Sequence, residues 1–275
     1  MLQKKISFID ETYNEVFLEN YNLYVFIYKN YSIHTMLDTR INKFVFFSSF
    51  PYDNLNTFKE KLFNKLINQN FKKIEIYLDT KYFFIPEHFF SENELITYYN
   101  YLSNKDKTNL LWAKFSKDII IIFEDFLLYE NFNKNNHFII LPNIITILRM
   151  SNKISSLYTK SNKFLIVNIS QSEFDILAVK EKKLFLCNRF SYINENDIIY
   201  FIFYVLNFFS SDNKKTEIYL NGNIEKKNLV EKKLKNFNFP LYYTKLNNEF
   251  TYTYRLNEIK QHKIANLFYI KDENY

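Results

Sequence analysis

Residues 22–53 of this chain, NLYVFIYKNYSIHTMLDTRINKFVFFSSFPYD, and residues 163–194, KFLIVNISQSEFDILAVKEKKLFLCNRFSYIN, share one pattern that decides the fold. The two stretches align without a gap at an offset of 141 positions (22 to 163). Each contains, in order, an apolar segment, a polar turn, an apolar segment, a charged turn and an apolar segment. Each stretch therefore predicts three strands joined by two short hairpins.

A helix and a fourth strand are expected after each stretch. Leucine and phenylalanine recur at helical spacing over residues 55–66, and residues 195–210 are apolar nearly all round, which is typical of a helix enclosed on several sides. The strand that follows reads EIYLD at 75–79 and EIYLN at 217–221, an offset of 142 (75 to 217). Four identical residues in five indicate an internal duplication.

The expected order of elements is three strands, a helix, a strand and a helix, and it occurs twice. This is the pattern of two ribonuclease H-like lobes. We expect an α/β fold with mixed sheets and flanking helices. Residues 1–160 form the first lobe, with an extra subdomain that includes strands at Leu110–Phe115 and Ile119–Phe123. Residues 161–275 form the second lobe, which includes a helix over Lys226–Phe237 and ends in a C-terminal tail.

Glycine is almost missing from the chain, and this excludes several classes of phosphate site. About 19 glycines are expected at 7% usage, whereas the sequence contains 1, at Gly222. A P-loop, a dinucleotide fingerprint and a glycine-rich kinase loop each need several residues without a Cβ. The excess of Phe, Tyr, Lys, Asn and Ile, all with AT-rich codons, indicates an AT-rich genome.

Cysteine content and hydropathy favour a soluble protein of a reducing compartment. Cys187 is the only cysteine, so no disulfide framework and no cysteine-based zinc site is expected. Met1–Glu11 lacks the apolar core of a signal peptide, and the longest apolar run, Ile198–Phe209, is shorter than the roughly 20 residues that span a bilayer. We therefore expect a cytoplasmic protein with no membrane span.

The chain resembles a known family along nearly its whole length. Two lobes of this kind form the actin-like architecture of sugar kinases, heat-shock ATPases and bacterial actin homologues, and more closely the chain resembles the bacterial domain of unknown function family 3822. The motifs that carry the likeness are Phe84–Phe90, Phe190–Tyr192 with Asp197, Ile218–Gly222, and Gln261–Leu267. The resemblance implies a fold and names no activity.

The resemblance also shows where a nucleotide site would lie. Actin-like ATPases hold phosphates on the two hairpins between first and second strands, using glycine and a metal-directing aspartate. Here those turns are expected at residues 27–30 and 168–171, and neither contains glycine or a carboxylate. Lys29, Asn168, Ser170 and Gly222 therefore mark a degenerate nucleotide cleft of a pseudo-ATPase that does not hydrolyse ATP in the usual manner.

No other residue pattern predicts catalysis, a metal or a cofactor. A nuclease of this fold needs a carboxylate in the first strand, and neither first strand has one. Asp79 is interpreted as a strand-end residue, and His262, in the tail motif, as a structural histidine. Cys187 has no identifiable catalytic partner.

The sequence favours a non-catalytic binding or scaffold protein that recognises a protein partner. One alternative is a nucleotide-binding conformational switch without efficient hydrolysis. A second is an RNA- or DNA-binding accessory protein that uses lysines at 59–73 and 226–235, although a net charge of +6 with only four arginines makes nucleic acid an unfavoured partner. The pathway, the oligomeric state and the roles of His262 and Asp79 are not predicted.

Overall fold

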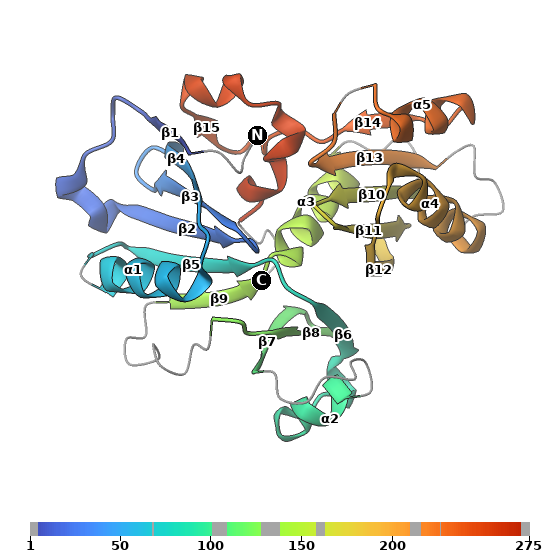
Figure 1. Cartoon of the computed structure of the whole chain (residues 1–275), viewed down its shortest axis with the longest axis horizontal. Coiled ribbons are helices and arrows are strands. Elements are labelled where there is room, and N and C mark those ends of the chain that lie inside the picture. Colours follow the sequence, from blue (N-terminus) through green and yellow to red (C-terminus); the bar gives the residue numbers. More distant parts are fainter. Residues whose placement is uncertain are drawn as a thin grey trace. The chain divides into compact units, whose positions relative to one another are not determined.

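The chain folds into two compact units. The computed structural model describes residues 5–67, 69–100, 109–127, 138–157, 163–209, 216–225 and 227–270. Unit 1 comprises Met1–Ile145 and Asn248–Leu256, and unit 2 comprises Thr146–Asn247 and Asn257–Tyr275. The lobe boundary expected at residue 160 stays a prediction; by packing, the chain passes from unit 1 to unit 2 near the start of helix α3 (Ile144–Leu157) (Figure 1).

Unit 1 is built on a mixed sheet. Among the described residues, its strand order is β1-β4-β3-β2-β5-β9, and β15 also pairs with β4. The strands are β1 (Ile6–Ile9), β2 (Tyr21–Ile27), β3 (Tyr31–Asp38), β4 (Lys43–Pro51), β5 (Lys73–Leu78), β9 (Phe138–Pro142) and β15 (Thr251–Tyr252). Helix α1 (Leu55–Ile67) follows β4, and the Asn54 side chain accepts hydrogen bonds from the backbone N–H groups of Asn56 and Thr57 at its start.

A second, smaller sheet of unit 1 lies between β5 and β9 in the chain. It contains β6 (Tyr82–Pro86), β7 (Leu110–Ser116) and β8 (Ile119–Glu124) in the order β6-β8-β7. The short helix α2 (Leu95–Asn100) precedes β7. The two strands expected in this region are therefore confirmed.

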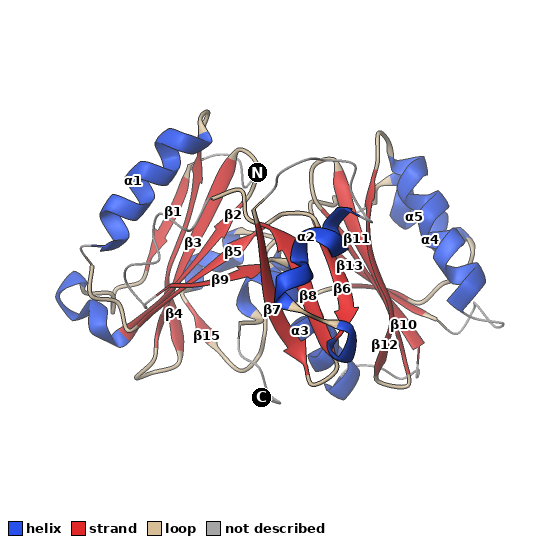
Figure 2. Cartoon of the chain, turned by 90° about the horizontal axis from the view of Figure 1, so that it is seen from below, coloured by secondary structure: helices blue, strands red, loops and turns tan. Residues whose placement is uncertain are grey.

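Unit 2 has a five-stranded sheet with helices α4 (Glu195–Phe209) and α5 (Leu229–Asn236) on one face (Figure 2). Its strands are β10 (Lys163–Ile169), β11 (Glu173–Lys180), β12 (Lys183–Ser191), β13 (Glu217–Gly222) and β14 (Leu241–Tyr243), in the order β12-β11-β10-β13-β14. Alternate residues of β10, β11 and β13 form one buried cluster with α4 and α5. Helix α5 begins later than expected, at Leu229 after the Asn228 cap, and Lys226 lies outside the described residues.

The two sheets have the same topology, which confirms the predicted repeat. In unit 1, β4-β3-β2-β5-β9 corresponds to β12-β11-β10-β13-β14 in unit 2, with antiparallel pairing among the first three strands and parallel pairing beyond. Even the β-bulges correspond, since the register shifts between Met36 and Leu37 and between Ala178 and Val179, 142 positions apart (36 to 178). This is the strand order of two ribonuclease H-like lobes.

The gap-free overlay of the two stretches is one residue off in the first two strands. The hairpin β2–β3 is closed by a hydrogen bond from the Tyr28 N–H to the Tyr31 carbonyl, and β10–β11 by one from Ser170 to Glu173, each 2.9 Å and 142 positions apart (28 to 170). Asn168 and Ile169 therefore belong to β10, and the expected turn at residues 168–171 is wrong. The two-residue bend is at residues 171–172. A one-residue slip matters because it exchanges the faces of a strand.

Helix α4 differs from expectation in its surroundings. Its inner residues, such as Ile202 and Leu206, are fully buried. Its outer side is not enclosed by the described part of the chain, because Tyr200, Tyr204 and Phe208 are 62%, 47% and 67% exposed. No helix in the described ranges is long and apolar enough to cross a membrane.

Candidate functional site

The ends of β10 and β13 gather three of the four predicted site residues. These strands are parallel neighbours, with Asn168 opposite Asn221 and Ile169 opposite Gly222. Ser170 follows directly, and its carbonyl accepts a 2.9 Å hydrogen bond from the Tyr192 hydroxyl. Asn168, Ser170 and Gly222 thus share one edge of the unit 2 sheet, as expected for strand ends in this fold.

Side chains at this edge bond to one another. The Asn168 amide donates to Asp175 Oδ2 at 3.1 Å, and the Asn221 amide donates to Asn168 Oδ1 at 2.7 Å and to Asn266 Oδ1 at 3.3 Å. The Thr244 hydroxyl donates to Asn221 Oδ1 at 2.6 Å. All five residues are buried. We call these five residues and Arg189 the strand-end network.

Arg189 completes the strand-end network by neutralising its carboxylate. The guanidinium donates from Nε to Asp175 Oδ1 at 2.7 Å and from Nη2 to Oδ2 at 3.1 Å. Such a two-bond pair satisfies the buried carboxylate and leaves little of it for a cation. Among the described residues, no group of three His, Cys, Asp or Glu is placed to hold a metal ion.

Gly222 has a structural reason to be glycine. Its φ is +85°, a region that other residues adopt only with strain. A Cβ built on it would lie 2.2 Å from the Ile169 carbonyl oxygen. The single glycine therefore allows β13 to end against the backbone of β10.

Lys29 lies in unit 1, whereas the other three predicted residues lie in unit 2. It is exposed in the two-residue bend between β2 and β3. The tyrosines on either side of this bend, Tyr28 and Tyr31, stack with ring centroids 4.5 Å apart and an interplanar angle of 6°. Burial raises the pKa of Tyr31 far above its usual range, so the Tyr31 hydroxyl stays protonated. Aromatic rings therefore support the bend at which the resemblance places a phosphate.

The other two singled-out residues have structural contacts. Asp79 follows β5, and its backbone N–H donates to the Ile27 carbonyl at 2.9 Å. His262 is buried in the tail, with Nε2 2.9 Å from the Ile224 carbonyl oxygen and its ring 4.6 Å from that of Tyr243. His262 thus holds the tail against the segment that follows β13.

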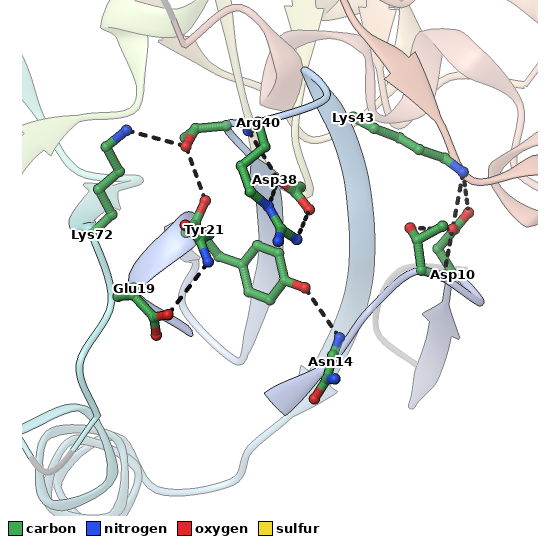
Figure 3. A network of polar contacts seen from close by, with 11 residues as sticks. Asp10, Asn14, Glu19, Tyr21, Asp38, Arg40, Lys43 and Lys72 are labelled. Carbon is green, nitrogen blue, oxygen red and sulfur yellow. Dashed lines mark hydrogen bonds and ion pairs between the residues drawn. The ribbon is translucent and has the colours of Figure 1, made fainter. Parts of the chain in front are cut away.

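A separate polar cluster of unit 1 contains two ion pairs, Arg40–Asp38 and Lys43–Asp10 (Figure 3). Arg40 binds Asp38 through two nitrogen–oxygen contacts of 2.7 and 3.1 Å, and Lys43 binds Asp10 at 2.8 Å. The Tyr21 hydroxyl accepts a 3.1 Å hydrogen bond from the Asn14 backbone. These contacts fix the β2, β3 and β4 region.

Sequence reasoning missed Asp175, Arg189, Thr244 and Asn266. Asp175 gave a usable signal, because it is a charged residue inside the apolar run FDILAV, where burial requires a partner. Asn266 gave none, since it lies 45 positions from Asn221 in sequence and the two meet only in the folded chain.

Comparison with known proteins identifies the fold. A family model described as a protein of unknown function (DUF3822) matches residues 10–239. A crystal structure from Bacteroides thetaiotaomicron VPI-5482, of a protein with an actin-like ATPase fold and unknown function, is similar with a TM-score of 0.76 and 17% identity, over 94% of this chain and all of that chain. A chain of the PilM–PilN type IV pilus biogenesis complex is similar with a TM-score of 0.61 and 9% identity, over 91% and 99%. No curated protein sequence matches. The predicted actin-like ATPase fold is thereby confirmed.

Proposed function

Because this chain belongs to the DUF3822 family of proteins of unknown function and has the actin-like ATPase fold, we propose that it is a non-catalytic scaffold protein that recognises a protein partner. In this proposal the nucleotide machinery of the fold is lost. The fold remains as a support for a binding surface.

The strand-end network is the observation that carries the non-catalytic part. A phosphate or Mg²⁺ site needs donors or carboxylates that are available to the ligand. Here Asn168, Asn221 and Asp175 bond to one another and to Arg189, Thr244 and Asn266. Opening this buried network for a ligand would cost the hydrogen bonds that hold it together.

The outer side of α4 supports the partner part. Its exposed aromatic residues repeat at every fourth position, and neighbouring rings contact each other, with centroids 6.2 Å apart for Tyr200–Tyr204 and 4.9 Å for Tyr204–Phe208. Contiguous exposed apolar surface typically marks an interaction site. The similar PilM–PilN structure is itself a complex of two proteins, which favours the same kind of role here.

Thermal denaturation with ATP and Mg²⁺ tests the non-catalytic part. A ligand at 100 times its dissociation constant stabilises a protein by about 2.7 kcal/mol. We expect no change in melting temperature up to about 5 mM MgATP. A saturable rise would overturn the proposal in favour of a nucleotide-binding switch, and phosphate release above a no-protein blank would overturn it in favour of an ATPase.

Comparative co-purification tests the partner part. The wild type and a variant are each purified from the cells that encode this chain, and the proteins that co-purify with them are compared. In the variant, Tyr200, Tyr204 and Phe208 are all replaced by serine. The control replaces three exposed α5 residues, Lys232, Lys233 and Asn236, by serine. We expect the first variant alone to lose a co-purifying protein. If all three proteins retain the same partners, α4 is not the recognition surface.

The nucleic-acid alternative is weakened because three of the lysines on which it depends are bonded within the protein. Lys59 is buried and donates to the Phe126 carbonyl, Lys73 pairs with Glu75 at 2.5 Å, and Lys235 pairs with Glu231 at 2.6 Å. These cations are engaged within the protein and have less to offer a phosphate backbone. Retention on DNA or RNA that falls steeply with salt would restore this alternative.

A further inference from the structure

Unit 2 contains a cavity of about 250 Å³ beside β13 and β14. The residues that line it come from three parts of the unit: the sheet, helix α3 and the C-terminal tail. The lining residues are Ile154, Tyr219, Tyr242, Tyr243, Thr244, Lys245 and Tyr269. Four of the seven are tyrosines, so most of the wall is aromatic.

Contacts between rings and hydrogen bonds of two tyrosine hydroxyls hold this wall in place. Tyr219 and Tyr242 face each other across the parallel strands with ring centroids 5.2 Å apart. The Tyr219 hydroxyl donates to Glu217 at 2.9 Å, and the Tyr269 hydroxyl donates to the Lys245 carbonyl at 3.2 Å. Burial and the Glu217 contact raise the pKa of Tyr219, which keeps that hydroxyl protonated. The cavity is therefore pre-formed, which lowers the entropic cost of binding.

The same EIYL sequence has different surroundings in unit 1. In unit 1 the same pair recurs as Glu75 and Tyr77, whose hydroxyl donates to the Glu75 carboxylate. Tyr77 is fully buried and stacks on Phe26, with centroids 4.8 Å apart. Tyr77 pairs with Leu141 of β9, whereas Tyr219 pairs with Tyr242 of β14. One copy of the motif thus lies in a filled core and the other beside an open cavity.

Two polar groups of the lining are available to a ligand. Within the described ranges, no hydrogen bond or ion pair joins the Lys245 ammonium or the Tyr242 hydroxyl to another residue. Both side chains are exposed to solvent at the cavity. The buried carboxylate of Glu217 does not line the cavity and is already bonded to the Tyr219 hydroxyl. The available charge at the cavity is therefore positive.

We propose that this cavity binds a small aromatic acid, with its ring against the tyrosine faces and its carboxylate at Lys245. The volume lies below the roughly 300–1,000 Å³ of typical drug-sized sites, which limits the ligand to one or two fused rings. Aromatic rings pack favourably in offset or edge-to-face arrangements on such a wall. This site is separate from the α4 surface. The ligand proposal is therefore independent of the proposed scaffold role.

Ligand-observed saturation-transfer NMR and titration calorimetry test the proposal with four named probes. The acids are 4-hydroxyphenylacetate and indole-3-acetate, and the neutral counterparts are 4-ethylphenol and indole-3-ethanol. We expect saturable binding of at least one acid, about tenfold tighter than its neutral counterpart, a difference of about 1.4 kcal/mol.

Three variants locate the binding. Lys245→Met is expected to remove the preference for the acid while the neutral probe still binds, and Tyr242→Ala is expected to abolish binding of both. Lys233→Met, an exposed lysine of α5 outside the cavity lining, serves as the matched control and should change nothing. Melting curves confirm that each variant is folded. Absence of saturable binding by both acids up to about 5 mM, or binding that survives Tyr242→Ala, would overturn the proposal.

Discussion

Gly222 shows how one backbone position can hold a strand end in place. The residue has φ +85°, and its backbone lies against Ile169 so closely that no side chain fits. The next residue, Asn223, donates its N–H to the same Ile169 carbonyl at 2.6 Å. This geometry gives a physical reason for the single glycine of the chain.

Replacing Gly222 by alanine should therefore destabilise unit 2. The new Cβ must displace the Ile169 carbonyl and also adopt a strained φ, which together cost about 2–4 kcal/mol. Urea denaturation followed by circular dichroism measures the change. Asn223→Ala, at the adjacent exposed position, is the control and should cost less than about 1 kcal/mol. Equal effects of the two substitutions would contradict this reading of the strand end.

Glu231 is a buried carboxylate of unit 2 with three hydrogen-bond donors. It lies in the first turn of α5, where it accepts hydrogen bonds from the Lys227 backbone, from Lys235 Nζ at 2.6 Å and from the Tyr243 hydroxyl at 2.6 Å. Burial by itself would raise the pKa of this carboxyl, but these donors outweigh it and lower the pKa to about 2.

The stability that Glu231 contributes should depend on pH in a defined window. Because the folded pKa lies below the unfolded value near 4.5, the contribution is complete above about pH 4.5 and is lost as pH falls toward 2. Glu231→Gln should thus cost about 2 kcal/mol at pH 7 and progressively less below pH 4.5, as measured by urea denaturation across pH. Glu258→Gln, at an exposed carboxylate of the same unit, should show no such dependence.

At the scale of elements, α4 has two apolar sides with different roles. The inner side belongs to the buried cluster with β10, β11, β13 and α5. The outer side is aromatic and exposed. Hydrophobic periodicity cannot separate these roles, because a helix that is apolar all round gives the same pattern whether or not its outer side is covered.

Alanine substitutions on the two sides of α4 should therefore differ. Ile202→Ala removes a fully buried side chain and should cost about 2–4 kcal/mol of unfolding free energy. Tyr204→Ala, at a position 47% exposed, should cost less than about 1 kcal/mol. Chemical denaturation of both variants measures the difference. A large cost at Tyr204 would show that the outer side is a stabilising part of the fold and not a free surface.

At the scale of the whole molecule, the C-terminal segment serves both units. Asn248–Leu256 returns to unit 1, where β15 pairs with β4 and the Glu249 carbonyl accepts a 2.6 Å hydrogen bond from Asn42. The following residues return to unit 2, where Asn266 joins the strand-end network and the side chains of residues 264–268 are buried. The tail motif therefore contributes to the core of unit 2.

Truncation after Asn247 should consequently destabilise both units. Unit 1 loses an edge strand, and unit 2 loses Asn266 together with the buried apolar residues of the tail, an effect of several kcal/mol. Hydrogen exchange followed by mass spectrometry should show faster exchange in β4 and in β13. Unchanged protection of β13 in the truncated chain would show that the tail is dispensable to unit 2. A point variant, Asn266→Ala, should weaken protection in unit 2 alone.

The sequence by itself determined the repeated strand order, because strand and helix periodicity are local and the two copies of the pattern reinforce each other. It also determined that the first-strand turns lack the glycines of a phosphate site. The exact register could not be predicted from the sequence. The first two strands of the repeat are offset by 142 positions, whereas β5 and β13 begin 144 positions apart (73 to 217). Such shifts are set by cross-strand hydrogen bonds and not by local pattern.

Only the tertiary structure decided which polar residues meet and where space remains. Asn221 bonds to Asn168, 53 positions away, and Arg189 closes on Asp175 from a neighbouring strand. The cavity beside Tyr219 exists because Tyr242, α3 and the tail come together around it, whereas Tyr77 of the same motif in unit 1 is fully buried and stacks on Phe26. Contacts and empty volume depend on residues distant in sequence, and therefore on the packing of the whole unit.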